Sequence, residues 1–177
     1  MTATEEIVSL VDEHGRVVGE APRSRMRAEN LRHAATGVLL RDPDGRIYVH
    51  RRSPAKDWCP GCHDAAAGGV LRPGEQPEPA AERELAEELG VSGAALRPLL
   101  TQLFEDETVR CFEHVYEATY DGVVRHPDGE VVWGGWMQLP ELGRLLRDPS
   151  WPFVPDTRSV LARLAREGVG DYPALLE

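Results

Sequence analysis

The sequence has few cysteines, no long apolar run and no excess of basic residues. Its three cysteines are an odd number, which does not suggest a secreted disulfide framework. No stretch of about 18 apolar residues is present, so we expect no membrane span. A formal net charge of −10 disfavours a binder of nucleic acid polymers, which needs a basic face. Residues 1–6 are acidic and lack the basic and apolar regions of a signal peptide, so a cytoplasmic location is expected.

The negative charge also sets a condition on any anionic substrate. Bulk electrostatics would repel such a substrate, so a bound divalent cation and local basic residues would have to reverse the sign at the site. Lysine is nearly missing from the chain, with Lys56 as the one example. Arginines and Lys56 are therefore the side chains from which contacts to an anion are expected.

The sequence predicts one domain over residues 1–177, of the α/β class, in which helices sandwich a mixed sheet. A chain of 177 residues can enclose a full core without disulfides. Strands are expected at residues 7–11, 16–20, 35–41, 46–52, 65–71, 95–106, 109–120 and 131–139. Helices are expected at residues 22–30, 77–89, 140–147 and 155–167. The first two strands form an N-terminal β-hairpin extension over residues 5–21, and residues 43–45 predict a second hairpin between 35–41 and 46–52. The core spans about residues 31–168.

Residues 77–89 form the clearest of the predicted helices. Ala81, Leu85 and Leu89 share one apolar stripe, which would face the core. Gly90 follows at the position where a glycine commonly ends a helix.

A second face of the same helix concentrates carboxylates. Glu84, Glu87 and Glu88 stand at i, i+3 and i+4, so they project to one side. Three adjacent carboxylates repel one another, and a hard divalent cation such as Mg²⁺, which prefers oxygen ligands, is the simplest reason to gather them. Taken alone, a glutamate-rich helix is more often a solvated face paired with arginines.

The helix belongs to a longer sequence pattern, which argues against the interpretation that its glutamates form an ordinary solvated face. Seven of its positions are fixed residue types, which chance would produce about once in 10⁷ starting positions. The pattern is Gly69-x5-Glu75-x7-Arg83-Glu84-Leu85-x-Glu87-Glu88-x-Gly90-Val91. It matches the Nudix box at every defining position, and the sequence therefore resembles the Nudix hydrolase superfamily.

The resemblance implies an α/β/α sandwich in which the box forms a strand, a loop and a helix. It implies Glu84, Glu87 and Glu88 as ligands of Mg²⁺ or Mn²⁺, with the Gly68 carbonyl as a further candidate ligand. Other residues of the box would hold the loop and orient the carboxylates. These structural residues are Gly69, Glu75, Arg83 and Gly90.

Outside the box, the sequence is similar to the isopentenyl diphosphate isomerase branch and its isomerase-like hydrolases. The shared motifs are His33-Ala34, Arg52-Ser53-x2-Lys56 and Trp58-x-Pro60-Gly61. In the register set by these motifs, the catalytic cysteine of the isomerase falls on Gly68 and a metal-binding histidine falls on Val70. Glycine cannot move a proton and valine cannot bind a metal, so we expect no isomerase activity. His33 is then expected to be structural or to face the substrate.

The cysteine-containing motif of residues 59–63 admits rival readings. Cys59, Cys62 and His63 have the spacing of a haem-attachment motif, which normally requires export. A zinc site that adds His50, and a redox-active pair of thiols, are further alternatives. The favoured interpretation is that Cys59 and Cys62 are two thiols beside an active-site entrance.

The sequence thus predicts metal-dependent hydrolysis of a phosphoric anhydride in a small nucleoside-diphosphate-type substrate. Catalytic residues would be Glu84, Glu88 and Glu130, with either Glu84 or Glu130 as the general base. The substrate phosphates would contact Arg52 and Lys56, which could instead be solvated, with Arg51 and Arg72 as additional candidates. A Nudix-type ligand sensor with little catalysis is the alternative. The group attached to the diphosphate stays open, and a homodimer is possible.

Overall fold

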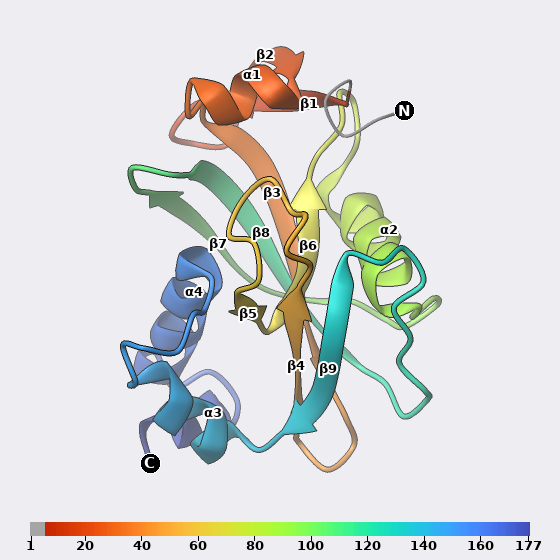
Figure 1. The fold of residues 1–177 in the computed structure, drawn as a ribbon, viewed down its shortest axis with the longest axis vertical. Coiled ribbons are helices and arrows are strands. Elements are labelled where there is room, and N and C mark those ends of the chain that lie inside the picture. The colour runs from red at the N-terminus through yellow and green to blue at the C-terminus, as the bar shows by residue number, and fades with distance from the viewer. Residues whose placement is uncertain (1–5) are drawn as a thin grey trace.

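The computed structural model describes residues 6–177, which form a curled mixed sheet flanked by helices (Figure 1). In this range the strands are β1 (Ile7–Val11), β2 (Val17–Pro22), β3 (His33–Arg41), β4 (Ile47–Arg52), β5 (His63–Asp64), β6 (Ala66–Val70), β7 (Arg97–Glu105), β8 (Arg110–Thr119) and β9 (Val131–Met137). The helices are α1 (Arg23–Ala28), α2 (Pro77–Leu89), α3 (Leu139–Leu146), α4 (Pro155–Arg166) and the 3-10 helix η1 (Tyr172–Leu176). The predicted α/β class with a mixed sheet is confirmed.

Strand β3 organises the sheet because both of its edges are occupied. β6 pairs with it in antiparallel orientation, and β8 pairs with it in parallel orientation over the same residues. The predicted pairing of β3 with β4 as a hairpin is wrong for most of their length, since the two strands meet only at Arg41 and Ile47. A strand has two edges, and with both edges of β3 taken, β4 diverges to pair with β9 and β5.

Helix α2 has the bounds predicted from the sequence. Pro77 lies in its first turn, and Gly90 ends it with a left-handed φ of 65°, a conformation that glycine adopts without steric cost. Ala81, Leu85 and Leu89 are buried against the sheet, as the apolar stripe predicted.

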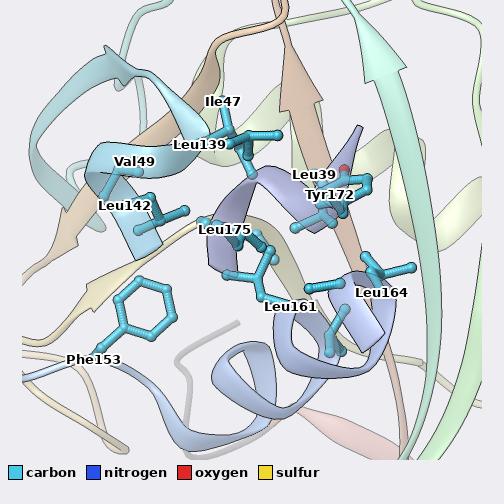
Figure 2. Packing of buried hydrophobic residues seen from close by; sticks show 14 of the residues in the cluster. Leu39, Ile47, Val49, Leu139, Leu142, Phe153, Leu161, Leu164, Tyr172 and Leu175 are labelled. Carbon is cyan, nitrogen blue, oxygen red and sulfur yellow. The ribbon is translucent and has the colours of Figure 1, made fainter. Parts of the chain in front are cut away.

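The largest core cluster lies where α3, α4 and η1 cover one part of the sheet (Figure 2). Leu161 and Leu164 of α4 and Tyr172 of η1 are fully buried there. The Tyr172 hydroxyl donates a hydrogen bond to Glu117 at 2.7 Å, which ties η1 to β8. Tyr172 therefore adds a buried aromatic ring to the hydrophobic core from outside residues 31–168, which the sequence pattern did not reveal.

The N-terminal hairpin and α1 form a small unit at one end of the sheet (Figure 1). β1 and β2 pair as predicted, and Leu10 of β1 lies opposite His33 of β3; residue 5, where the predicted hairpin begins, is outside the described residues. β2 leaves Val17 and Val18 exposed at the sheet edge. The formation of a homodimer stays a prediction. None of the helices in residues 6–177 is long and apolar enough to cross a membrane.

Candidate active site

A cavity of about 700 Å³ brings together residues of α1, β3, β6, α2 and the segment 52–58. In Figure 1, α2 and α4 lie on two sides of the strands that form its floor, β3, β6 and β8. Most of the residues predicted for the site line this cavity. They include the carboxylates of Glu84, Glu87 and Glu130 and the cations of Arg52, Lys56 and Arg72.

Glu84 lies against the glycine strand β6. Its residue is 8% exposed, so this face of α2 is not the solvated face of an ordinary glutamate-rich helix. A Cβ atom at Gly69 would lie 2.5 Å from Glu84 Oε1, so any side chain at this position would force the carboxylate to move. Burial raises the pKa of Glu84, and the Arg83 guanidinium, 2.6 Å from Glu84 Oε1, opposes the shift.

Glu88 is the most deeply buried of the three helix carboxylates, at 2% exposure. Its Oε2 accepts a hydrogen bond from the Gly68 amide at 3.2 Å, and Lys56 Nζ lies 4.0 Å from its Oε1. Burial raises the pKa of Glu88 well above its ordinary range. Lys56 is also ion-paired with Glu130, so one ammonium group connects Glu88 on α2 to Glu130 before β9.

Arg83 joins the loop of the motif to its helix. It donates to both carboxylate oxygens of Glu75, at 2.8 and 3.0 Å, in the bidentate geometry that makes such pairs specific. The ion pair of Arg83 with Glu87, expected from their i, i+4 spacing, is present at 3.3 Å. Glu75 also accepts the Arg72 amide at 2.9 Å, which fixes the turn before α2.

Arg51 and Arg52 have different positions although they are neighbours in β4. Arg52 is 7% exposed and lines the cavity, where its guanidinium donates to the carbonyls of Trp58 and Cys59. Arg51 is exposed, donates to the Gly61 carbonyl and does not belong to the cavity lining. Successive side chains of a strand point to opposite faces, so the structure separates Arg51 from the site.

Comparison with known proteins decides what this arrangement belongs to. The family model described as "NUDIX domain" matches residues 31–164 of the chain. The chain belongs to the Nudix family. A Nudix hydrolase of Rhodococcus erythropolis, orf19, is 44% identical over 172 residues, which cover 92% of this chain and 93% of that protein. The Nudix hydrolase YfcD of Escherichia coli K12 is 35% identical over 160 residues, 90% of this chain and 87% of YfcD.

Solved structures agree with the Nudix assignment. DR0079 from Deinococcus radiodurans superimposes with a TM-score of 0.76 at 29% identity, over 89% of this chain and 98% of that one. The NUDIX domain of Shewanella oneidensis NrtR, solved in complex with ADP ribose, has a TM-score of 0.61 at 19% identity and covers 77% of this chain and 88% of its own. The second likeness shows a shared fold. The protein is a Nudix hydrolase, an enzyme that acts on acid anhydrides.

The geometry at Gly68 argues against isomerase chemistry in this Nudix enzyme. A Cβ atom at this position would lie 2.1 Å from the Thr36 carbonyl oxygen of β3. The position that would carry the catalytic cysteine of an isomerase therefore has no room for any side chain. Val70, in place of a metal-binding histidine, is buried in an apolar cluster.

The donor set of this Nudix site fits a hard divalent cation, although the ligands do not converge. Glu84 and Glu88 are both buried, burial raises the pKa of each, and the negative charge of Glu84 adds to the rise for Glu88. Within residues 6–177 no three His, Cys, Asp or Glu side chains are gathered tightly enough to hold a metal ion. Arg83 and Lys56 instead act as counter-ions of Glu84 and Glu88. Oxygen donors of this kind suit Mg²⁺ or Mn²⁺.

The cysteine motif forms no metal site in the described part of the chain. His63 stacks on Trp151 with ring centroids 4.8 Å apart, and burial together with the neighbouring thiol of Cys62 raises the pKa of Cys59 to about 12. A thiol with a raised pKa is a poor nucleophile at neutral pH. This arrangement supports neither the zinc site nor the redox-active pair, and both stay predictions.

The structure also adds residues that the sequence pattern did not single out. Arg23 and Arg27 of α1 reach the cavity, and both pair with Asp57 of the loop above β4. Asp64 and Glu113 are buried on the cavity wall. These residues are scattered along the chain, and no local spacing could have connected them.

Proposed function

We propose that this Nudix hydrolase cleaves the phosphoric anhydride of a small nucleoside-diphosphate-type substrate with the help of Mg²⁺ or Mn²⁺. One observation carries the proposal: the buried carboxylates Glu84 and Glu88 lie beside a cavity that also presents Arg52 and Lys56. A metal–phosphate complex requires carboxylates to bind the metal and basic side chains to bind the phosphate oxygens. The ADP ribose bound to the NrtR Nudix domain is a compound of the class proposed here.

The residues of this chain divide the work as follows. Glu84, Glu87, Glu88 and the Gly68 carbonyl would hold the divalent cation, which when bound neutralises negative charge on the phosphates. Arg52, Lys56 and Arg72 would contact the remaining phosphate oxygens. Arg83 positions the glutamates through its bonds to Glu75, Glu84 and Glu87.

Hydrolysis requires a base for the attacking water. The water oxygen forms a bond to phosphorus, the bridging P–O bond breaks, and the two products leave as phosphates. Glu84 or Glu130 would accept the proton, because both carboxylates line the cavity. Glu130 is half exposed and can reach solvent, whereas Glu84 is held by Arg83. Comparing the pH profiles of Glu84→Gln and Glu130→Gln would assign the base.

The decisive experiment is a phosphate-release screen over diphosphate compounds, with and without Mg²⁺, on the wild type and on Glu88→Gln. We expect Glu88→Gln to lose at least about 100-fold in turnover while it keeps its fold, because it removes a charged ligand without changing side-chain size. Glu82→Gln is the matched control, since Glu82 is exposed on the same helix. A folded Glu88→Gln protein with wild-type turnover would reject the metal site. Tight diphosphate binding by the wild type without turnover in Mg²⁺ would instead indicate a ligand sensor.

A further inference from the structure

The cavity has a second group of carboxylates that the proposed diphosphate site does not use. Asp64 at the end of β5, Glu113 of β8 and Asp156 in the first turn of α4 all line it, and we call these three residues the acidic wall. Asp64 is 6% exposed and Glu113 is 4% exposed. They come from three elements, so the fold and not a local motif brings them together.

No arginine or lysine of residues 6–177 forms an ion pair with the acidic wall. Asp64 accepts the Ala66 amide at 3.0 Å, Asp156 accepts the Thr157 amide at 2.8 Å, and Glu113 accepts the Gln102 side-chain amide at 3.0 Å. Burial raises the pKa of each carboxyl group, and repulsion within the wall adds to the rise for Glu113 and for Asp156, whose pKa reaches about 7. Unpaired buried carboxylates destabilise a fold, so packing alone gives no reason to keep them.

Two buried polar groups that line the cavity each have an atom without a hydrogen-bond partner among the described residues. Glu113 uses Oε2 for Gln102, while its Oε1 faces the backbone of Gly37, where a Cβ atom would lie only 3.0 Å away. Because residue 37 has no side chain, Glu113 Oε1 stays open to the cavity that both residues line. His33, which is 3% exposed and lines the same cavity, is bonded through Nδ1 to the Leu31 carbonyl at 3.0 Å, and its Nε2 has no partner among the described residues.

We propose that the acidic wall of Asp64, Glu113 and Asp156 binds the hydroxyl groups of a sugar in the part of the substrate beyond its diphosphate. This inference rests on the proposed function and names the chemical class of the attached group. Carboxylate oxygens accept hydrogen bonds, and a sugar supplies several donors close together. An alkyl chain would bury these oxygens without partners, and a further anionic group would be repelled.

The test compares how diphosphate probes bind to the full-length protein in Mg²⁺, measured by calorimetry. ADP ribose carries sugar hydroxyls beside its diphosphate, isopentenyl diphosphate carries an apolar chain, and inorganic pyrophosphate carries neither. We expect ADP ribose to bind at least about tenfold more tightly than isopentenyl diphosphate, because buried acceptors discriminate strongly against a ligand that lacks the donor.

Variants of the wall connect this preference to its residues. Glu113→Gln and Asp156→Asn keep the side-chain shapes and relieve repulsion, so both should fold. Each should weaken ADP ribose binding about tenfold or more and leave pyrophosphate binding within about twofold. Glu107→Gln, at an exposed position in the turn between β7 and β8, is the charge-matched control.

Three results would overturn the proposal. They are equal or tighter binding of isopentenyl diphosphate, unchanged ADP ribose binding in both wall variants, and a matching loss of pyrophosphate binding. Failure of the proposed function would look different, because it would appear as missing Mg²⁺-dependent turnover in the wild type. The binding comparison needs no turnover and so tests the wall separately.

Discussion

Single glycines decide where the reactive groups of this enzyme can lie. Gly68 and Gly69 are consecutive in β6, and they meet different neighbours because their side-chain directions alternate. A Cβ atom at Gly69 would meet Glu84, while one at Gly68 would meet the Thr36 carbonyl at 2.1 Å and Gly37 Cα at 2.9 Å. The Gly68 constraint is the stricter one, because a strand backbone cannot rotate away as a side chain can.

Replacing Gly68 with alanine should therefore destabilise the protein. The added methyl group has to push β3 and β6 apart, and overpacking of this kind costs about 1–3 kcal/mol. Urea unfolding followed by circular dichroism measures the difference. Gly19→Ala is the control, because no atom lies within 4 Å of a Cβ at that position in β2. Equal stability of the two variants would show that β3 and β6 are not held as closely as described.

At the scale of elements, local signals were enough for helix α2 but not for the pairing of strands. The sequence predicted that α2 begins at Pro77 and ends before Gly90, and the structure has the same ends. The turn between β3 and β4 was visible too, yet the partners of β3 come from β6 and β8, far along the chain. The same limit applies to the site: the contiguous box could be predicted, whereas the acidic wall depends on which distant elements meet.

We expect the N-terminal unit to restrain the loop of residues 53–62, which follows β4. Arg23 of α1 donates to both oxygens of Asp57, at 2.7 and 3.1 Å, and its side chain is only 15% exposed. Arg23→Met should therefore increase amide hydrogen exchange in residues 53–62, because it removes the bidentate contact while it keeps the length of the side chain. Arg25→Met is the control, since Arg25 is exposed and pairs with Glu29 of its own helix end. Unchanged exchange in the loop after Arg23→Met would show that the loop is held by other contacts.

At the scale of the whole molecule, the cavity has an excess of acidic side chains, which disfavours the binding of an anionic substrate. Six lysine and arginine residues line it against eight aspartate and glutamate residues, a formal excess of two negative charges. An anionic diphosphate would meet this excess within a chain that is itself strongly acidic. One divalent cation would cancel this excess, so under the proposed function we expect the metal to assist substrate binding as well as catalysis.

The metal should therefore stabilise the folded protein measurably. A cation present at about 100 times its dissociation constant adds roughly 2.7 kcal/mol, which for a chain of this length raises Tm by about 5 °C or more. Differential scanning calorimetry with Mg²⁺, and again after EDTA, measures this gain. Because burial raises the pKa of Glu88, protons compete with the cation, and the gain should shrink as the pH falls. Glu88→Gln should lose the Mg²⁺ response and Glu82→Gln should keep it; equal responses in both would place the cation away from α2.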